Sequence, residues 1–288
     1  MSKIALSTNT MKHWIAPRSK VANKGEFGHV LIIGGDYGMP GAVSIAGMGA
    51  AFMGAGLITV ITRPEHITAV LSNRPELLCY GLKSSQTQLL KHLLAKASMI
   101  ILGPGLGESN WSRWLFKTTL QYIRTHQTPC LIDADGLNWI SKTNWVSQPS
   151  CIFTPHPGEA ARLLACSVET IQSNRTDAIK KLQKKLGGVI VLKGAESLVY
   201  TAEEAVHICH AGNPGMASGG MGDLLSGIIA GLITQGLTPW QAAQMGVLLH
   251  AQAGDAALEK LGGPGLLASD LLPELKPLLR RQLNHLII

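Results

Sequence analysis

The segment from Asn213 to Ile228 contains the residues in this chain that are best suited to chemistry. Its sequence, NPGMASGGMGDLLSGI, places Gly219, Gly220 and Met221 just before the acid Asp223, where a loop should become an apolar helix. Glycine-rich backbone leaves N–H groups free to converge, and a helix start favours negative charge. The segment therefore predicts an anion cradle with a carboxylate placed to accept a proton. A helix cap would also explain the acid, but not the glycines around it.

Two more glycine-rich loops follow strand-like runs. The first, GGDYGMPGA from Gly34 to Ala42, enters a helix of small residues, and the second, GPGLG, spans Gly103 to Gly107. Either loop could be a tight turn, and either could bring its backbone close to a flat or anionic ligand.

An acidic loop, DADGLN, follows the strand that ends at Ile132. Its Asp133 and Asp135 could form a paired-carboxylate metal site, or Asp135 could cap the next helix. We favour a capping role for one acid and a role in a ligand loop for the other.

The motif TPHPGE carries a histidine between two prolines. Pro157 suits a first helical turn, and Glu159 would lie near the positive end of that helix. His156 is not explained by helix initiation, and we interpret it as a ligand contact.

The motif KGAES, from Lys193 to Ser197, again ends a buried strand. Lys193 could contact phosphate oxygens as a point charge, or it could be a solvated turn lysine.

The elements that must position these loops alternate between strand and helix. Apolar strand-like runs are expected at 29–33, 57–61, 77–80, 99–102, 130–132, 151–153 and 189–192, and a hairpin at 198–200 and 206–209 should form an antiparallel edge. Helices are expected at 41–53, 86–95, 111–125, 157–165, 169–186, 223–235, 239–261 and 268–279. This alternation predicts a largely parallel sheet covered on both faces, with ligands at the carboxyl ends of its strands.

Composition favours one soluble domain that binds small anions. The hydrophobic content is 46%, and the net charge is +7. The densest basic group, Lys180 to Lys185, follows helical spacing, and aromatic residues make up only 5% of the chain, so we expect no nucleic-acid partner.

The cysteines and the N-terminus predict a cytoplasmic protein. The five cysteines contain no CxxC pair and are expected to be reduced core residues. The first residues, MSKIALSTNT, lack the apolar run of a signal peptide, and the helix Leu224–Ile233 is too short to span a membrane.

Taken together, the motifs resemble the ribokinase-like superfamily and, within it, the ADP-dependent NAD(P)H-hydrate dehydratase family. They occur in the family's order between Gly28 and Gly236: GHVLIIGGDYGMPGA, GLITV, GPGLG, DADGLN, TPHPGEAARLL, VLKGAES and GNPGMASGGMGDLLSGIIAGL. The resemblance implies a three-layer αβα sandwich with a mostly parallel central sheet and no lid domain. We expect an N-terminal extension at residues 1–24 and one dehydratase domain at 25–288.

The resemblance also implies an activity. Members of the family repair hydrated NADH and NADPH with ADP, releasing AMP and phosphate. Ala42, Gly105, Gly107 and His156 match positions that contact the hydrated dinucleotide, and Asp223 matches the position beside its reacting hydroxyl. The matches to nucleotide-binding positions are Lys193, Gly194, Ala195, Glu196, Ser197 and Gly222.

Mg²⁺ is the expected cofactor. Glu159 matches the acid of the NxxE magnesium motif of related sugar kinases, but His156 replaces the asparagine. We therefore expect Glu159 to reach the metal through water.

The expected partners follow from the same resemblance. We expect this chain to lack the epimerase domain that is fused to some members, and so to act on the S epimer and depend on a separate NAD(P)H-hydrate epimerase. A homotetramer is expected, and the helix Pro239–Leu261 is apolar enough to contribute to its interface.

Asp223 would act as a base at its ordinary acidity, taking the hydroxyl proton as the oxygen attacks the terminal phosphorus of ADP. Two alternatives stay open. One is a small-molecule kinase of the same fold, similar to hydroxyethylthiazole or pyridoxal kinase, and the other is a nucleotide sensor without turnover.

Overall fold

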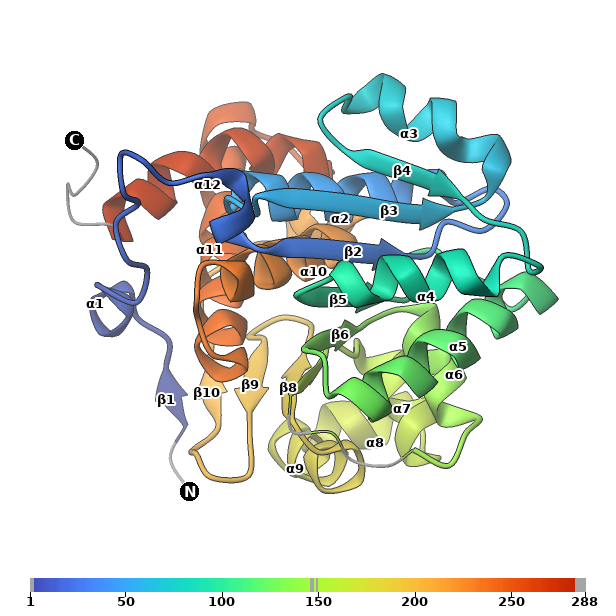
Figure 1. Ribbon diagram of the computed structural model, residues 1–288. Helices are drawn as coiled ribbons and strands as arrows, with labels where there is room; N and C mark the ends of the chain where they lie inside the picture. Colours follow the sequence, from blue (N-terminus) through green and yellow to red (C-terminus); the bar gives the residue numbers. More distant parts are fainter. Residues whose placement is uncertain (1–2, 146–147, 149, 283–288) are drawn as a thin grey trace.

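A ten-stranded sheet forms the middle of the molecule (Figure 1). The computed structural model describes residues 3–145, 148 and 150–282. The strand order across the sheet is β1-β10-β9-β8-β7-β6-β5-β2-β3-β4. The strands are β1 (Ile4–Ala5), β2 (His29–Ile33), β3 (Leu57–Thr62), β4 (Leu78–Gly81), β5 (Met99–Leu102), β6 (Cys130–Ile132), β7 (Cys151–Phe153), β8 (Val189–Leu192), β9 (Leu198–Tyr200) and β10 (His207–Ile208).

The strand directions confirm the predicted parallel sheet. Strands β2 to β8 pair in parallel, and β9 runs antiparallel to both β8 and β10. The β9–β10 hairpin is therefore present, but it is not the edge of the sheet as expected. Strand β1 pairs with β10, placing Ile4 opposite His207, because the N-terminal segment folds back onto the hairpin.

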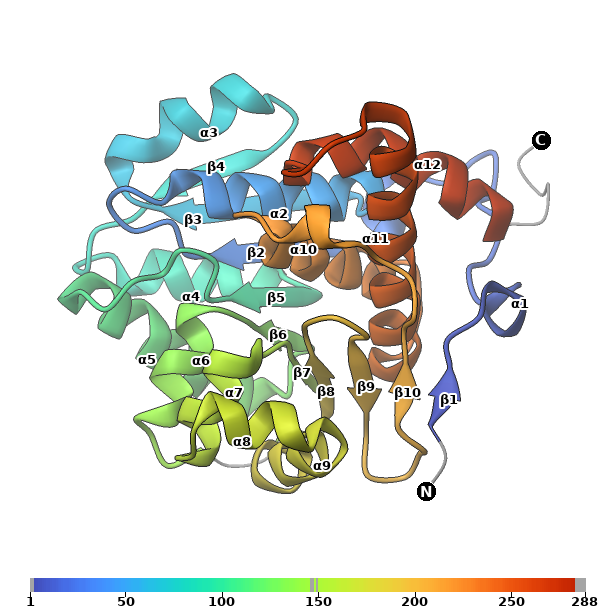
Figure 2. The same cartoon turned by 180° about the vertical axis from the view of Figure 1, so that it is seen from behind.

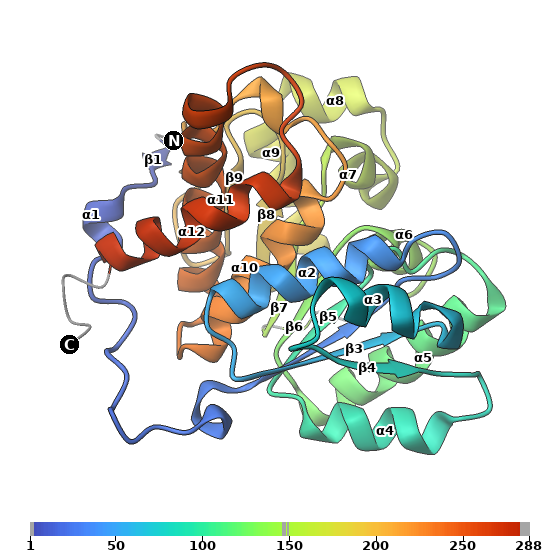
Figure 3. The same cartoon turned by 90° about the horizontal axis from the view of Figure 1, so that it is seen from above.

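Helices cover both faces of the sheet, giving three layers (Figure 3). Alternate strand residues point to opposite faces, so neighbours such as Leu31 and Ile32 belong to different apolar clusters. One face is covered by α2 (Pro40–Phe52), α3 (Ile67–Asn73), α10 (Met221–Thr234), α11 (Pro239–Leu261) and α12 (Ala268–Gln282). The other is covered by α4 (Thr87–Lys96), α5 (Asn110–His126), α6 (Asp135–Ser141), α7 (Pro157–Leu164), α8 (Val168–Ser173) and α9 (Arg175–Leu186).

The helices α2 and α10 lie in unusually close contact. A Cβ added to Gly227 in α10 would collide with the carbonyl oxygen of Ala46 in α2. One added to Gly49 in α2 would lie 2.6 Å from the carbonyl oxygen of Leu224. The small residues of both helices thus allow their backbones to touch, and this contact fixes α10 above the sheet.

Several helices differ from the sequence expectation. The helices α3 and α6 were not predicted, because each is a short helix of seven residues. The predicted helix at 169–186 is two helices, α8 and α9, and Asn174 separates them. The Asn174 side chain accepts a hydrogen bond from the Asp177 N–H and so caps α9.

The N-terminal segment packs against the rest of the chain. After β1 it forms α1 (Thr8–Met11), whose Met11 is 1% exposed and lies in the core with α11. A 3₁₀ turn at Lys24–Phe27 then leads into β2.

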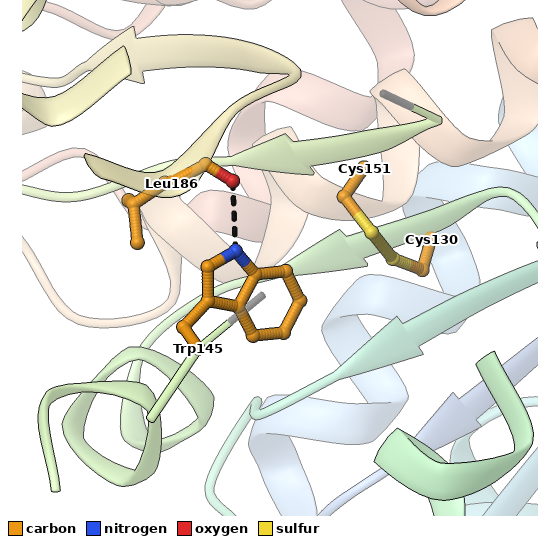
Figure 4. Close-up of a disulfide and its surroundings, with 4 residues drawn as sticks. All are labelled: Cys130, Trp145, Cys151 and Leu186. Atoms are coloured by element: carbon orange, nitrogen blue, oxygen red, sulfur yellow. Dashed lines mark hydrogen bonds between the residues drawn. A yellow bond between two sulfur atoms is a disulfide. The ribbon is translucent and has the colours of Figure 1, made fainter. Parts of the chain in front are cut away.

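Two of the cysteines form a disulfide between neighbouring strands. Cys130 of β6 and Cys151 of β7 lie opposite each other in the sheet, with their Cα atoms 4.8 Å apart (Figure 4). Nearby, the Trp145 indole N–H donates to the Leu186 carbonyl oxygen. The expectation that all five cysteines are reduced is wrong for this pair, since strand pairing brings the two thiols into bonding range. Cys79, Cys166 and Cys209 are free.

None of the helices among the described residues is both long enough and apolar enough to cross a membrane.

Candidate active site

The loops that follow β2, β5, β6, β7 and β8 are joined at the carboxyl edge of the sheet. The Asp36 N–H donates to the Gly105 carbonyl oxygen at 2.7 Å, and the Asp133 N–H donates to the Leu102 carbonyl oxygen at 3.2 Å. The Lys193 N–H donates to the Pro155 carbonyl at 2.9 Å. These bonds bring the sequence-predicted motifs together, although they are far apart along the chain.

The amino end of α10 lies over this edge. Figure 2 shows the preceding segment running from β10 along α11 before it enters α10. Asp255 of α11 holds that segment by accepting hydrogen bonds from the Gly212 N–H and the Asn213 side chain, both at 2.9 Å. Gly220, with φ of 85°, is the residue that caps α10. A Cβ at Gly219 would meet no atom within 4 Å, so this part of the loop is open.

A buried ion pair lies directly beneath the start of α10. The Lys193 Nζ is 2.7 Å from Asp133 Oδ1, and Asp133 Oδ2 accepts a hydrogen bond from the Ser226 hydroxyl at 2.7 Å. A Cβ on Gly222 would lie 3.1 Å from the Lys193 Nζ. Lys193 is therefore not a solvated turn lysine, because its ammonium group is paired with Asp133 and lies next to Gly222.

The charges around Lys193 keep it protonated. Burial alone would lower its pKa, but the nearby carboxylates, Asp133 first and then Glu159, outweigh burial and raise the pKa above its usual value. The site therefore holds a permanent positive charge beside the helix start.

Asp223 is the third residue of α10 and does not cap the helix. Burial, together with repulsion from Asp133, Asp135 and Glu159, raises its pKa to about 7, although Lys193 acts in the opposite direction. The expectation of ordinary acidity is therefore wrong. The carboxyl group is a stronger base than a solvated aspartate, which suits general-base chemistry near neutral pH.

His156 and Glu159 form a reciprocal cap at the start of α7. The His156 Nδ1 accepts from the Gly158 N–H at 3.0 Å, and Glu159 Oε2 accepts from the His156 N–H at 2.7 Å. The sequence interpretation missed this capping role, since histidine is not a common capping residue. The His156 side chain remains half exposed, and burial together with the charge of Lys193 lowers its pKa, which favours the neutral ring.

Glu159 faces the same buried charges. Its carboxyl oxygen Oε2 lies 3.9 Å from the Lys193 Nζ. Burial raises the Glu159 pKa to about 7, with Lys193 opposing the shift. Among the described residues no group of three or more His, Cys, Asp or Glu side chains is arranged to hold a metal ion.

The sequence suggested that Asp135 caps α6, but in the structure it does not. The cap position is Ala134, which has a φ of 47° and makes no side-chain cap bond. Asp135 instead accepts the Gly107 N–H at 2.8 Å and the Asn138 amide at 3.1 Å. It thereby ties the second glycine loop to α6.

The two glycine loops are packed face to face. A Cβ on Gly105 would lie 3.1 Å from the Ala42 Cβ and 2.9 Å from the Met39 carbonyl oxygen. The structure therefore brings Ala42 and Gly105 together. The tight-turn interpretation also holds here, because a Cβ on Gly34 would collide with the Pro104 carbonyl.

The loop Lys193–Ser197 is shaped by Arg175, which the sequence interpretation missed. Arg175, the first residue of α9, donates to the carbonyl oxygens of Leu192 (3.1 Å), Lys193 (3.3 Å) and Glu196 (3.5 Å). Glu196 has a φ of 55° and pairs with the exposed His210 at 2.8 Å.

Ser226 and His250 were also missed. Ser226 was hidden in an apolar helical run, although it lies one turn after Asp223. His250 of α11 is buried and hydrogen-bonds the Met221 backbone, and burial lowers its pKa to about 4. His250 could have been found from the sequence, because it is a histidine within the largely apolar helix predicted at 239–261.

Comparison with known protein families gives a clear relationship. Residues 30–277 match the family described as NAD(P)H-hydrate dehydratase. The chain is 49% identical over 261 residues to a bifunctional NAD(P)H-hydrate repair enzyme of Coxiella burnetii, covering 91% of this chain and 52% of that protein. It is 36% identical over 251 residues to the ADP-dependent (S)-NAD(P)H-hydrate dehydratase of Streptococcus thermophilus, covering 85% of this chain and 88% of that one. The chain spans about half the length of the first of these relatives.

Solved structures confirm the fold class. A ribokinase-like superfamily protein of Enterococcus faecalis superposes with a TM-score of 0.87 at 30% identity, over 97% of this chain and 96% of the other. The ADP/ATP-dependent NAD(P)H-hydrate dehydratase of Bacillus subtilis, co-crystallised with ATP and Mg²⁺, superposes with a TM-score of 0.85 at 26% identity, over 98% and 99%.

Proposed function

Because this chain belongs to the NAD(P)H-hydrate dehydratase family, we propose that it removes water from the S epimer of hydrated NADH and NADPH. It would use ADP and release AMP and phosphate. The observation that carries the proposal is the position of Asp223, a carboxyl group with a pKa of about 7, at the start of α10 beside Lys193 and the glycine cradle.

The first step is a proton transfer. The hydroxyl of the hydrated nicotinamide ring is a poor leaving group, so the enzyme must convert it to a better one. Asp223 takes the hydroxyl proton on its carboxylate oxygen while the hydroxyl oxygen attacks the terminal phosphorus of ADP. The bond from that phosphorus to the bridging oxygen breaks, and AMP leaves.

The charge on the transferring phosphoryl group needs compensation. Lys193 and the backbone N–H groups from Gly219 to Gly222 supply it, because both lie at the same helix start. The lone pair of the ring nitrogen then expels phosphate, and transfer of the neighbouring C–H proton to the released phosphate restores the reduced nicotinamide.

The binding positions follow from the same arrangement. Ala42, Gly105, Gly107 and His156 would contact the hydrated dinucleotide. The loop that Arg175 holds, Lys193–Ser197, together with Gly222, would bind ADP. Asp223 would both contact the hydroxyl of the substrate and take its proton.

The Glu159 carboxylate suits a magnesium ion that arrives with the nucleotide. Mg²⁺ prefers oxygen ligands and keeps several waters and phosphate oxygens, so it does not need a cluster of three protein side chains. Both Glu159 oxygens are near the His156 cap, one accepting the His156 N–H and the other 3.4 Å from Nε2. Glu159 would therefore hold the ion through water, and the ion would neutralise phosphate charge.

One assay tests the proposal. The protein is incubated with hydrated NADH, ADP and Mg²⁺, and the absorbance of reduced nicotinamide is followed together with phosphate release. We expect recovery that requires ADP and matches phosphate release mole for mole, with consumption of the S epimer only. A stable phosphorylated product would identify a kinase instead, and binding without turnover would identify a sensor.

We also propose that a separate epimerase supplies the S epimer and that the chain forms a homotetramer. Adding an epimerase to the assay should extend recovery from the S epimer to the whole mixture, and sedimentation should give four times the chain mass. Most apolar residues of α11 are buried within the chain, so this helix has few apolar side chains left to contribute to the proposed interface.

A further inference from the structure

Tyr37 is a large aromatic residue that is held in place yet left open to solvent. It lies in the loop after β2 and is 59% exposed. Its hydroxyl donates to Glu65 at 3.2 Å, its N–H donates to Asp36 at 2.8 Å, and the His66 ring meets it edge-on at 5.9 Å. An exposed ring adds little to the stability of the fold, so these contacts point to a role for Tyr37 in binding.

A buried charged pair supports the ring from beneath. The Arg63 guanidinium lies between two rings, 4.3 Å from the centre of Tyr37 and 4.4 Å from that of Trp111. Asp36 accepts from Arg63 Nε at 2.7 Å and from the Ser109 hydroxyl at 2.6 Å. One face of Tyr37 is thus covered by a cation that Asp36 holds in place, while more than half of the residue remains open to solvent.

The ring lies next to the loops proposed to bind the hydrated dinucleotide. Two residues after Tyr37, Met39 packs against both glycines of the second loop: its Cβ is 2.8 Å from the position of a Cβ on Gly105, and its Cε is 3.5 Å from one on Gly107. Tyr37 therefore lies two residues from the side chain that contacts both glycines.

The hydrated dinucleotide contains one flat aromatic group that could stack on the Tyr37 ring, its adenine base. Its hydrated nicotinamide ring is partly saturated, whereas its adenine is fully aromatic. The adenine of ADP is a poorer candidate, because the nucleotide loop follows β8. Four strand spacings of about 4.8 Å, roughly 19 Å, separate β8 from β2.

We propose that the outer face of Tyr37 is a stacking platform for the adenine base of the hydrated dinucleotide. This proposal rests on the proposed function, and it adds a subsite that distinguishes a dinucleotide from a mononucleotide. Arg63 and Asp36 are its positioning residues.

Two substrates with the same reacting ring provide the test. Hydrated NADH carries the adenylate half, and the hydrate of reduced nicotinamide mononucleotide lacks it. For Tyr37→Leu we expect the KM for hydrated NADH to rise roughly 5- to 150-fold, the range of one base–aromatic stack, with kcat unchanged. The KM for the mononucleotide hydrate should stay within about twofold of wild type.

Two control variants separate stacking from folding. Tyr37→Phe keeps the ring and should keep the wild-type KM for hydrated NADH. Tyr80→Leu removes another partly exposed tyrosine, on β4, and should change neither KM. An equal rise in KM for both substrates, or no rise for either in Tyr37→Leu, overturns the platform.

A failure of the proposed dehydratase function can be distinguished from a failure of the Tyr37 platform. If the wild-type protein dehydrates neither hydrate, the platform is tested by calorimetric titration with NADH while AMP saturates the nucleotide loop. Weaker binding of NADH to Tyr37→Leu than to Tyr37→Phe supports the platform, and equal binding overturns it.

Discussion

At the residue scale, the site is governed by the charges that Asp223 and Lys193 share. The carboxyl groups of Asp133, Asp135 and Glu159 act on Asp223 at the carboxyl edge of the sheet, and Lys193 supplies a positive charge among them. This imbalance keeps the lysine charged and makes Asp223 more basic than usual. The same charges thus prepare a phosphate-binding cation and a proton acceptor side by side.

The proton acceptor can be tested by an isosteric change. Asp223→Asn keeps the size of the side chain and removes its basicity, so we expect turnover to fall by about 10²–10⁴. Binding of ADP, measured by calorimetry, should persist because Lys193 and the cradle remain. A variant with near-wild-type turnover would show that another group takes the proton.

The raised pKa of Asp223 also predicts a pH dependence. Asp223 accepts a proton only when ionised, so kcat should fall about tenfold for each pH unit below a pKa of about 7 and level off above it. Glu159 has a pKa of about 7 as well. We therefore expect Glu159→Gln to keep the ionisation but move it to lower pH, since one repulsive charge is gone. A profile flat through neutral pH would contradict the assignment.

At the scale of elements, the contact between α2 and α10 positions the cradle. The two helices touch through Gly49, Gly227 and Gly231, where a side chain would meet the backbone of the other helix. Because α10 begins at the cradle, any displacement of the helix moves Asp223 relative to Lys193.

A single added methyl group tests this contact. Gly227→Ala introduces a Cβ that collides with the Ala46 carbonyl, and overpacking of this kind costs about 1–3 kcal/mol in the free energy of unfolding. Gly41→Ala is the matched control, because a Cβ there meets no atom within 4 Å. Denaturant unfolding should separate the two variants, and equal stabilities would mean that the helices adjust without cost.

At the scale of the whole molecule, the disulfide joins the middle of the sheet. Cys130 and Cys151 are fully buried and lie on the strands that lead to Asp133 and to the His156 loop. The cross-link therefore ties together two of the five strands whose loops form the candidate site.

A thiol titration checks this pairing. After unfolding in denaturant without reductant, the chain should show three reactive thiols, those of Cys79, Cys166 and Cys209. Adding a reductant should raise the number to the five cysteines of the sequence and lower the free energy of unfolding by about 2–4 kcal/mol. Five thiols before reduction would show that the pair is not oxidised.

Much of the fold could be predicted from the sequence, because local patterns specify it. The apolar runs at His29–Ile33 and Val189–Leu192 were confirmed as strands of a parallel sheet, and the motif order identified the family. Short helices such as α3 and α6 escaped prediction, since seven residues give too few turns for a clear periodicity.

The sequence by itself determined the α/β class, the family and the candidate residues Asp223, Lys193 and the glycine loops. Only the tertiary structure decided how acidic Asp223 is, that Asp133 holds Lys193 beneath Gly222, and that Cys130 faces Cys151. The physical reason is that a pKa, an ion pair and a disulfide each depend on groups brought together in space, whereas strand and helix patterns depend on neighbours along the chain.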